Sequence, residues 1–287
     1  MSYRTPAALR AALEARLVNA SRAKGTDLDR LRRRVVFERI LARLATATGE
    51  RWILKGGFAL EVRLGDRARA TRDLDVALGE PAEDGADVRD ALIDALATSA
   101  GDDFAFAVAR QQEIVPDEAG RPGWRFSVTA TLAGREFQRV RVDVVARPDE
   151  IAGRTEQIRM PTFLEFAGLD DVSVEAVDRR QHFAEKLHAL TRDYGDRPNT
   201  RVKDLPDLLT LIEHGLEPDE ELLAAVESLF ETRRTHPVPD ALPVPPASWR
   251  TAYEQYATEV ALDASTLDVA HERLTEFWST TLRSAEL

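Results

Sequence analysis

Residues 69–78 read RATRDLDVAL, and this stretch decides the fold of the region around it. Its second half predicts a β-strand, and successive side chains of a strand point to opposite faces. Asp73 and Asp75 would then share one face, while Leu74 and Val76 point into the core. Two carboxylates about 7 Å apart along a strand can bind one hard cation or bridge two. The alternative is a solvent-facing strand edge, or an aspartate that caps the next segment.

A second stretch lies just upstream, where residues 51–60 read RWILKGGFAL. A short apolar strand ends at Lys55, and the chain restarts as a helix after Gly56 and Gly57. Glycines at such a junction let the backbone approach a ligand, and the first N–H groups of a helix can bind a phosphate. A tight strand-to-helix turn without a ligand is the alternative. A phosphate cradle followed by a carboxylate pair on the next strand is what Mg-nucleotide chemistry needs.

A third candidate is the alternating stretch RVRVDVV at residues 139–145. Its valines would point into the core, which leaves Arg139, Arg141 and Asp143 on the other face. If this strand lies beside the first carboxylate pair, Asp143 becomes a third carboxylate. It could deprotonate an attacking hydroxyl or complete a second metal site. An arginine–aspartate ladder on the surface is the alternative.

Two further candidates lie on helices in the second half of the chain. Lys186 falls in the apolar helix FAEKLHAL at residues 183–190, where it could bind a triphosphate oxygen or lie at the surface with its stem packed. Asp204 falls in RVKDLPDLL at residues 201–209, where it could cap a helix or pair with Arg201. His188 is expected to be a packed or surface histidine, because no second histidine lies at metal-binding spacing.

The composition limits the classes of protein that this chain can be. With 44% hydrophobic and 31% charged residues among 287, it has the content of a globular protein rather than a disordered one. The absence of cysteine excludes disulfides and thiolate metal sites. A net charge of −11 argues against broad coating of nucleic acid, although it leaves room for a local basic surface. No run is apolar enough for a signal peptide or a membrane span, so we expect a cytoplasmic protein without a membrane partner.

The positive charges are almost all arginines. Of 39 basic residues only four are lysines, namely Lys24, Lys55, Lys186 and Lys203. Against such a bias, a position that keeps lysine is a candidate for needing a compact ammonium group.

The periodicity predicts an α+β fold, with a mixed α/β core sheet between a helical N-terminal arm and a helical C-terminal half. The expected domains are 1–48, 49–150 and 151–287. In the arm we expect helices at 7–19 and 28–47, with Thr26 as the N-cap of the second. The core is expected to hold strands at 52–54, 73–78, 104–114, 124–132 and 137–145, with helices at 58–64 and 84–99. The C-terminal half is expected to be mostly helical, at 161–167, 174–194, 200–213, 218–233, 249–261 and 265–282, with a proline-rich surface excursion at 236–246.

Taken together and in order, these motifs resemble the AbiEii/AbiGii nucleotidyltransferase toxins, including the mycobacterial MenT group, within the DNA polymerase β-like superfamily. The resemblance runs from about Lys55 to Leu209. It rests on KGG at 55–57, RATRDLD at 69–75, EKLHA at 185–189 and RVKDL at 201–205.

The resemblance implies a toxin of a toxin–antitoxin system that acts in phage defence. Its members transfer a nucleoside monophosphate from an NTP in a Mg²⁺-dependent reaction that releases pyrophosphate. In the best understood relatives the acceptor is the 3′ end of tRNA, and the added nucleotides block aminoacylation and translation. A cognate antitoxin restrains the enzyme. We expect this chain to be a monomer.

The resemblance also implies roles for individual residues. Asp73 and Asp75 would be metal ligands, and Asp143 the third carboxylate, as a metal ligand or a base. Lys55, Gly56, Gly57 and Arg72 would contact the nucleotide, Lys186 the triphosphate, and Asp204 would belong to a later motif near the site. A basic track for RNA is expected at Arg63, Arg67, Arg69, Arg72, Arg192, Arg197, Arg201 and Lys203.

Two alternatives remain open at this stage. The same chemistry could act on a small molecule such as an aminoglycoside, or on a protein hydroxyl, because an acidic protein suits a cationic acceptor. A degenerate relative that only binds a partner is disfavoured, because all the carboxylates are present. A sugar-nucleotide transferase is also disfavoured, because residues 50–147 are few for its nucleotide-binding domain.

Overall fold

The structure is a computed structural model that describes residues 3, 5–110, 112–114, 122–151 and 154–284. The chain divides into two compact units. The first comprises Met1–Arg63, Ala70–Pro148 and Gln157–Ala176, and the second Leu64–Arg69, Asp149–Glu156 and Val177–Leu287. The domain boundaries expected at residues 48 and 150 stay a prediction.

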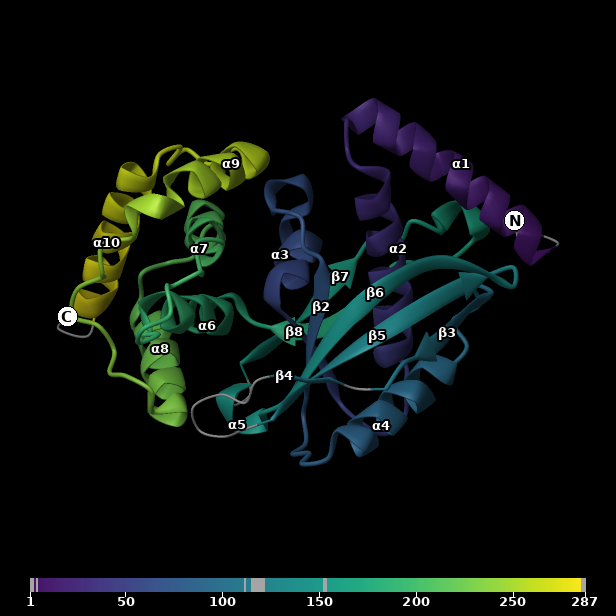
Figure 1. The fold of residues 1–287 in the computed structure, drawn as a ribbon, viewed down its shortest axis with the longest axis horizontal. Helices are drawn as coiled ribbons and strands as arrows, with labels where there is room; N and C mark the ends of the chain where they lie inside the picture. Colours follow the sequence, from purple (N-terminus) through teal and green to yellow (C-terminus); the bar gives the residue numbers. More distant parts are fainter. Residues whose placement is uncertain (1–2, 4, 111, 115–121, 152–153, 285–287) are drawn as a thin grey trace. The chain divides into compact units, whose positions relative to one another are not determined.

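Helices and strands alternate through the first half of the chain, and helices dominate the second (Figure 1). The helices are α1 (Pro6–Lys24), α2 (Leu28–Leu44), α3 (Gly56–Leu64), α4 (Gly85–Ala97), α5 (Pro148–Ile151), α6 (Arg179–Thr191), α7 (Asp204–Glu213), α8 (Glu220–Arg233), α9 (Arg250–Val260) and α10 (Leu267–Arg283). The strands are β1 (Trp52–Lys55), β2 (Asp73–Leu78), β3 (Phe104–Val108), β4 (Gln112–Ile114), β5 (Gly123–Leu132), β6 (Arg135–Ala146), β7 (Thr155–Met160) and β8 (Val172–Val177). The α+β class predicted from the sequence is confirmed.

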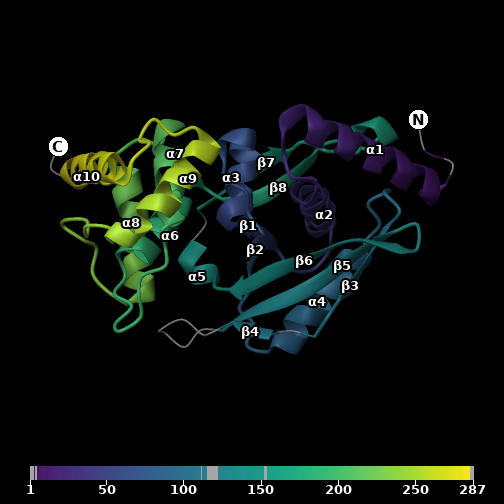
Figure 2. The same ribbon diagram turned by 45° about the horizontal axis from the view of Figure 1, so that its top comes forward.

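The strands form one mixed sheet in the order β3-β5-β6-β2-β1-β8-β7, and β4 pairs with β5 beside β3. Strand β2 runs antiparallel to β1 and parallel to β6, so it lies in the middle of the sheet. The long hairpin of β5 and β6 turns at Ala133 and Gly134, both of which have positive φ. Figure 2 shows this hairpin with β3 and α4 alongside it.

The hairpin strands are buried on alternate positions. In β5, Trp124, Phe126 and Val128 are buried, while the residues between them are half-buried. In β6, Val140 and Val142 are buried in the same way, and Arg141 between them is exposed. Period-2 burial of this kind marks a sheet with one face packed in the core and one open face. The open face is the one that carries polar side chains.

The second unit is a helical cluster. Its core is formed by side chains from α6 to α10 that are almost fully buried, among them Phe183, Leu208, Leu229, Tyr253 and Trp278. Helix α6 packs against both α7 and α8. Several of these helices begin after a polar residue of the kind preferred at N-caps. Asp178 for α6 and Asp219 for α8 each accept a hydrogen bond from a backbone N–H in the first turn. Across the described residues, no helix combines the length and the apolar character needed to span a membrane.

The sequence prediction was wrong where a strand and a helix follow each other closely along the chain. Residues 174–194 were expected to be one helix, but β8 occupies Val172–Val177 and α6 begins at Arg179. The polar and apolar alternation of β8 is the strand period, and Asp178 caps the helix that follows. Strand β7 was missed, and of the helix expected at 161–167 only a 3₁₀ turn at Glu165–Ala167 forms.

Two smaller expectations also need correction. The strand expected at 104–114 is two strands, β3 and β4, and residue 111 lies outside the described residues. The N-cap of α2 is Asp27 rather than Thr26; its carboxylate accepts the N–H of Arg30 at 2.8 Å. Strand β2 has the bounds predicted, and α3 begins two residues earlier than predicted, at Gly56.

Candidate active site

Three carboxylates share the open face of the sheet in the first unit. The register of β2 and β6 places Asp75 directly beside Asp143, and Asp73 lies two residues before Asp75 on the same strand. Directly paired residues in a sheet point to the same face, as do residues two apart on a strand. The prediction that residues 139–145 form a strand beside β2, with Asp143 next to the aspartate pair, is therefore confirmed.

Two of these carboxylates are paired with arginines. Arg125 of β5 donates from Nε and Nη2 to the two oxygens of Asp143, at 2.7 and 2.6 Å. Arg141 of β6 donates from Nε to Oδ1 of Asp73 at 2.5 Å. The hydrogen bond to Asp143, followed by the charges of all three aspartates, raises the pKa of Arg125 above its usual value. The arginine–aspartate ladder considered as an alternative does exist, and it lies on the same face as the carboxylate site.

The glycine at the end of β1 lets the backbone pass against one of these carboxylates. Gly56 has φ +62°, and a Cβ placed on it would lie 2.0 Å from Oδ2 of Asp75. Both the left-handed backbone and the contact therefore require glycine here. The preceding residue, Lys55, is buried and pairs with Asp75 across the antiparallel strands, so its side chain points to the same face. Gly57 is buried in the first turn of α3.

The donor set on this face fits a hard divalent cation. Carboxylate oxygens are the ligands that Mg²⁺ takes from proteins, and the guanidinium groups on Asp73 and Asp143 show that this face attracts cations. In the described part of the chain, no three His, Cys, Asp or Glu side chains are gathered closely enough to hold a metal ion. The carboxylates of Asp143 and Asp73 are each held by an arginine, Arg125 and Arg141 respectively.

The other two predicted site residues lie in the second unit and contact each other. Nζ of Lys186 donates to Oδ1 of Asp204 at 2.8 Å and lies 2.7 Å from Oδ2 of Asp207. Arg69 binds Asp207 through two hydrogen bonds of 2.8 Å, and Nε of Arg201 lies 2.8 Å from Oδ2 of Asp204. Apart from Arg201, all of these side chains are buried.

Burial and ion pairing shift the pKa values of Lys186 and Asp207 in opposite directions. Burial alone would lower the pKa of Lys186, but the charges of Asp204 and Asp207 outweigh it and raise that pKa. Burial would also raise the pKa of Asp207, but Lys186 and Arg69 hold it well below its usual range. Lys186 and Asp207 are therefore both charged at neutral pH.

Several sequence interpretations of this region were wrong. Lys186 is not a surface lysine, and Asp204 is the first residue of α7 rather than its cap, because its carboxylate is turned to Lys186 and Arg201. The predicted pairing of Arg201 with Asp204 is confirmed. Arg69 was expected in a basic track, but it is buried against Asp207. The partnership of Asp207 was missed; its position three residues after Asp204 on one helix face was the available signal.

The remaining lysine of this region is exposed. Lys203 precedes α7, and it forms no hydrogen bond or ion pair with any described residue. Partial desolvation, and then the charges of Arg69 and Lys186, lower its pKa below the usual value.

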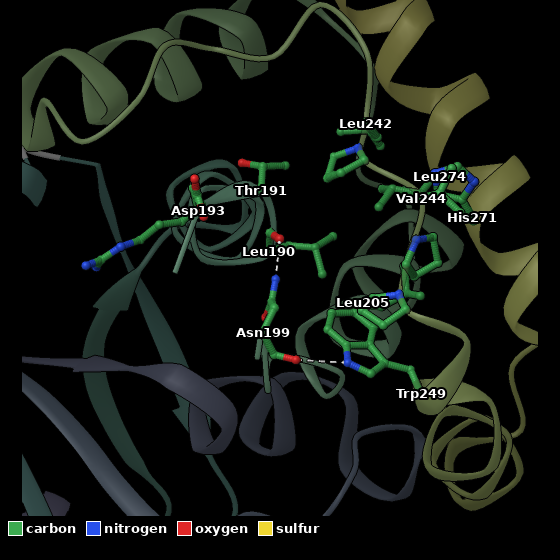
Figure 3. Close-up of a pocket in the computed structure, with 14 residues that line it drawn as sticks. Leu190, Thr191, Asp193, Asn199, Leu205, Leu242, Val244, Trp249, His271 and Leu274 are labelled. Carbon is green, nitrogen blue, oxygen red and sulfur yellow. Dashed lines mark hydrogen bonds between the residues drawn. The ribbon is translucent and has the colours of Figure 1, made fainter. Parts of the chain in front are cut away.

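The proline-rich segment forms one wall of a cavity in the second unit. The cavity has a volume of about 330 Å³ and is lined by Leu242 and Val244 of this segment, by Leu190 at the end of α6 and by His271 of α10 (Figure 3). Asn199 fixes the base of the cavity: its side chain donates to the carbonyl of Leu190, and its own carbonyl accepts from the indole N–H of Trp249, both at 3.0 Å. The lining is mainly apolar.

His188 is buried and packed, which is one of the two placements predicted for it. Its ring lies 4.8 Å from that of Phe230 and 4.7 Å from that of His236, and its Nε2 is 2.7 Å from the hydroxyl of Thr235. Burial, and then the neighbouring charge of Arg233, lower the pKa of His188 to about 3. The histidine is therefore neutral at physiological pH.

Comparisons with known proteins identify the family of this chain. Residues 39–278 match the family described as nucleotidyl transferase AbiEii toxin of a type IV toxin–antitoxin system. Among solved structures, the nucleotidyltransferase toxin MenT4 of Mycobacterium tuberculosis is similar in fold, with a TM-score of 0.54 at 20% identity over 93% of this chain and 98% of that one. A putative nucleotidyltransferase from H. pylori gives a TM-score of 0.42 at 13% identity, over 91% of this chain and 93% of that one. A search of curated proteins found no match.

The family match covers most of the chain, including both the aspartate pair on β2 and the Lys186–Asp204 pair. The chain belongs to the AbiEii family of nucleotidyltransferase toxins and is a nucleotidyltransferase.

Proposed function

We propose that this enzyme transfers a nucleoside monophosphate from an NTP to the 3′ end of tRNA, with Mg²⁺ as cofactor, and so blocks aminoacylation and translation. The observation that carries the proposal is the register of β2 and β6, which aligns Asp75 with Asp143 and sets Asp73 on the same face. Carboxylates grouped in this way beside a glycine junction suit a nucleotide whose phosphates share a cation with the protein.

The reaction is a displacement at phosphorus. The oxygen of the acceptor 3′ hydroxyl attacks the α-phosphorus, and the bond from that phosphorus to the oxygen bridging the β-phosphate breaks. Pyrophosphate leaves with the electron pair, and the hydroxyl proton passes to the carboxylate of Asp143. Mg²⁺ held by Asp73 and Asp75 would neutralise charge on the phosphate oxygens.

The remaining residues bind and orient the nucleotide. Lys55 and the backbone at Gly56 and Gly57 contact its phosphates, and Arg72 contributes a further positive charge. In this proposal Lys186 also contacts the triphosphate. Since its ammonium group already pairs with Asp204 and Asp207, that contact requires a shared or exchanged hydrogen bond.

Labelling of RNA tests the proposal. The purified protein is incubated with total tRNA, Mg²⁺ and each labelled NTP in turn, alongside the Asp75→Asn variant. We expect label in tRNA with one or two of the NTPs, and a loss of at least about a hundredfold in the variant, because a carboxylate that holds the metal is removed.

A matched variant controls for the loss of one negative charge. Asp90 is an aspartate of α4 whose side chain is 73% exposed, and Asp90→Asn should label tRNA as the unmodified protein does. Label that persists in Asp75→Asn would show that the metal assignment is wrong. If tRNA stays unlabelled while the protein binds Mg-NTP, a small molecule or a protein hydroxyl would replace RNA as the acceptor.

The family also implies a protein partner. A toxin of this kind is kept in check by a cognate antitoxin, and a role in phage defence belongs to the same proposal. Expression of the chain alone should arrest growth, whereas Asp75→Asn should not. An equal arrest by both would mean that toxicity does not come from nucleotide transfer.

A further inference from the structure

The first unit contains a groove lined by arginines, in a chain whose net charge is −11. The groove has a volume of about 540 Å³, and among the described residues its lining holds one carboxylate, that of Asp29. We call it the arginine groove, after its six cationic residues, Arg33, Arg72, Arg110, Arg125, Arg139 and Arg141. They come from several elements, including α2, β5 and β6, so the folding of the unit brings them together.

Much of this positive charge is not neutralised inside the protein. Arg72 and Arg110 are exposed, and neither forms a hydrogen bond or ion pair with a described residue. Arg139 is exposed; it donates to Thr129 at 3.2 Å and forms an exposed ion pair with Glu136 at 3.4 Å. Arg33 pairs with Asp29. The groove therefore presents a concentrated positive field to solvent.

Two arginines belong both to the groove and to the carboxylate site. Arg125 holds Asp143 and Arg141 holds Asp73. Their side chains are 37% and 49% exposed, so water and solutes reach both pairs. Solvent-exposed ion pairs of this kind contribute little and exchange partners easily. A phosphate that enters the groove can accept the same guanidinium hydrogen bonds in the same two-pronged geometry.

We propose that the arginine groove binds the phosphodiester backbone of the acceptor, and that its phosphates draw Arg125 and Arg141 away from Asp143 and Asp73. The carboxylate of Asp73 then becomes available to a divalent cation and that of Asp143 to the acceptor hydroxyl, so that acceptor binding and metal binding reinforce each other. The proposal rests on the proposed function, whose acceptor is RNA. Cations spread around a groove suit a chain of single charges better than the adjacent charges of a triphosphate.

Binding of RNA without metal tests the groove. A fluorescein-labelled single-stranded oligoribonucleotide is titrated in EDTA at several salt concentrations. The Arg110→Ala/Arg139→Ala double variant is compared with Arg159→Ala, which removes an arginine of β7 that is 81% exposed and lies outside the groove. For the double variant we expect the slope of log affinity against log salt to fall by about 1.4, since each phosphate contact to a single strand contributes about 0.7.

The same titration contains its control for folding. Arg110→Lys/Arg139→Lys keeps both charges and should retain most of the slope, and melting temperatures should agree across the set. An unchanged slope in the alanine double variant, or an oligonucleotide that does not bind the unmodified protein, would overturn the groove assignment.

Metal affinity tests the exchange of ion pairs. Mn²⁺ is titrated calorimetrically into the unmodified protein, with and without the oligonucleotide, after subtraction of a titration into the oligonucleotide alone. We expect RNA to tighten Mn²⁺ binding about fivefold, the effect of one exposed ion pair of about 1 kcal/mol. Without RNA, the Arg125→Gln/Arg141→Gln variant should bind Mn²⁺ as tightly as the unmodified protein binds it with RNA. Addition of RNA to the variant should not tighten Mn²⁺ binding further. Affinity that RNA leaves unchanged in the unmodified protein would overturn the exchange.

A further titration distinguishes the phosphates of the acceptor from those of the NTP. Inorganic tripolyphosphate replaces the oligonucleotide, and tightening by tripolyphosphate alone would assign the groove to the NTP and overturn its assignment to the acceptor. Failure of the groove is distinguishable from failure of the proposed function. Labelled tRNA with an unchanged slope would refute only the groove, whereas groove-dependent RNA binding without any labelling would refute only the transfer to RNA.

Discussion

The two units each hold an arginine in a two-pronged hydrogen bond with an aspartate, in opposite surroundings. Arg125 binds Asp143 at 2.6 and 2.7 Å on the open face of the sheet, and Arg69 binds Asp207 at 2.8 Å inside the helical cluster. The side chain of Arg125 is 37% exposed, whereas that of Arg69 is 9% exposed. The distances are nearly equal, but the free energies of losing a partner are not. An exposed pair contributes up to about 1 kcal/mol, and removal of one partner of a buried pair costs about 3–5 kcal/mol.

The difference indicates that the two groups of ion pairs open at different costs. On the sheet, an exposed pair opens at little cost in free energy, as the proposed exchange of partners requires. In the helical cluster, Lys186 pairs with Asp204 and Asp207 in a buried site, where the loss of a partner costs more.

The largest effect is expected from opening the buried cluster. Asp207→Asn leaves Arg69 and Lys186 short of a negative partner in a buried site, and should lower the free energy of unfolding by about 3–5 kcal/mol. Asp268→Asn is the matched control, because Asp268 forms an exposed pair with Arg250 and should cost less than about 1 kcal/mol. Urea unfolding measures both. Equal costs would remove the distinction between the two kinds of pair.

A smaller loss is expected at the glycine beside Asp75. Gly56→Ala imposes a strained backbone and pushes a Cβ against the carboxylate, which should cost about 1–3 kcal/mol and reduce nucleotide transfer. Gly25→Ala has nearly the same φ, +65°, with nothing within 4 Å of the added Cβ, so it measures the strain alone. The difference between the two variants in urea unfolding isolates the contact with Asp75. No difference, with transfer intact in both, would count against close approach of the backbone to this carboxylate.

The buried histidine of the second unit should make stability depend on pH. Unfolded His188 takes up a proton below its ordinary pKa of 6.5, whereas folded His188 does so only below about 3. Unfolding therefore binds a proton between these values, and stability should fall with decreasing pH in this window, by at most about 1.4 kcal/mol per pH unit.

The test compares urea unfolding from about pH 7 to about pH 5, above the range in which most carboxylates titrate. His188→Gln should flatten this part of the profile. A profile that keeps its slope in the variant would assign the acid sensitivity to another group.

The smallest effect is expected from the exposed pair on the sheet. Arg141→Gln removes the partner of Asp73 and should change the free energy of unfolding by less than about 1 kcal/mol, because Asp73 stays solvated. Arg159→Gln, which opens another exposed pair in the same unit, should behave alike. A cost of several kcal/mol for Arg141→Gln in thermal unfolding would mean that this pair is structural and not free to exchange.

The alternating stretches were readable because a strand has a fixed period. RVRVDVV predicted a strand with Asp143 outward, and that strand lies beside β2 with Asp143 next to Asp75. Where the local signal was ambiguous, prediction failed. In VSVEAV at residues 172–177, the last four residues were read as the start of the helix predicted at 174–194, because so short an alternation does not distinguish helix from strand until its sheet partner is known. β8 is a strand because it pairs with β1 in the core of the sheet.

The sequence by itself determined the α+β class and the family, since both depend on local order along the chain, and it predicted which residues carry the chemistry. Only the tertiary structure decided which partners those residues have. Arg69 is 138 positions from Asp207, and Arg141 is 68 from Asp73, so no local pattern relates them. Burial then distinguishes the exposed pairs on the sheet from the buried pairs of the helical cluster. The free energy of an ion pair depends on the solvent around it as well as on the residues that form it.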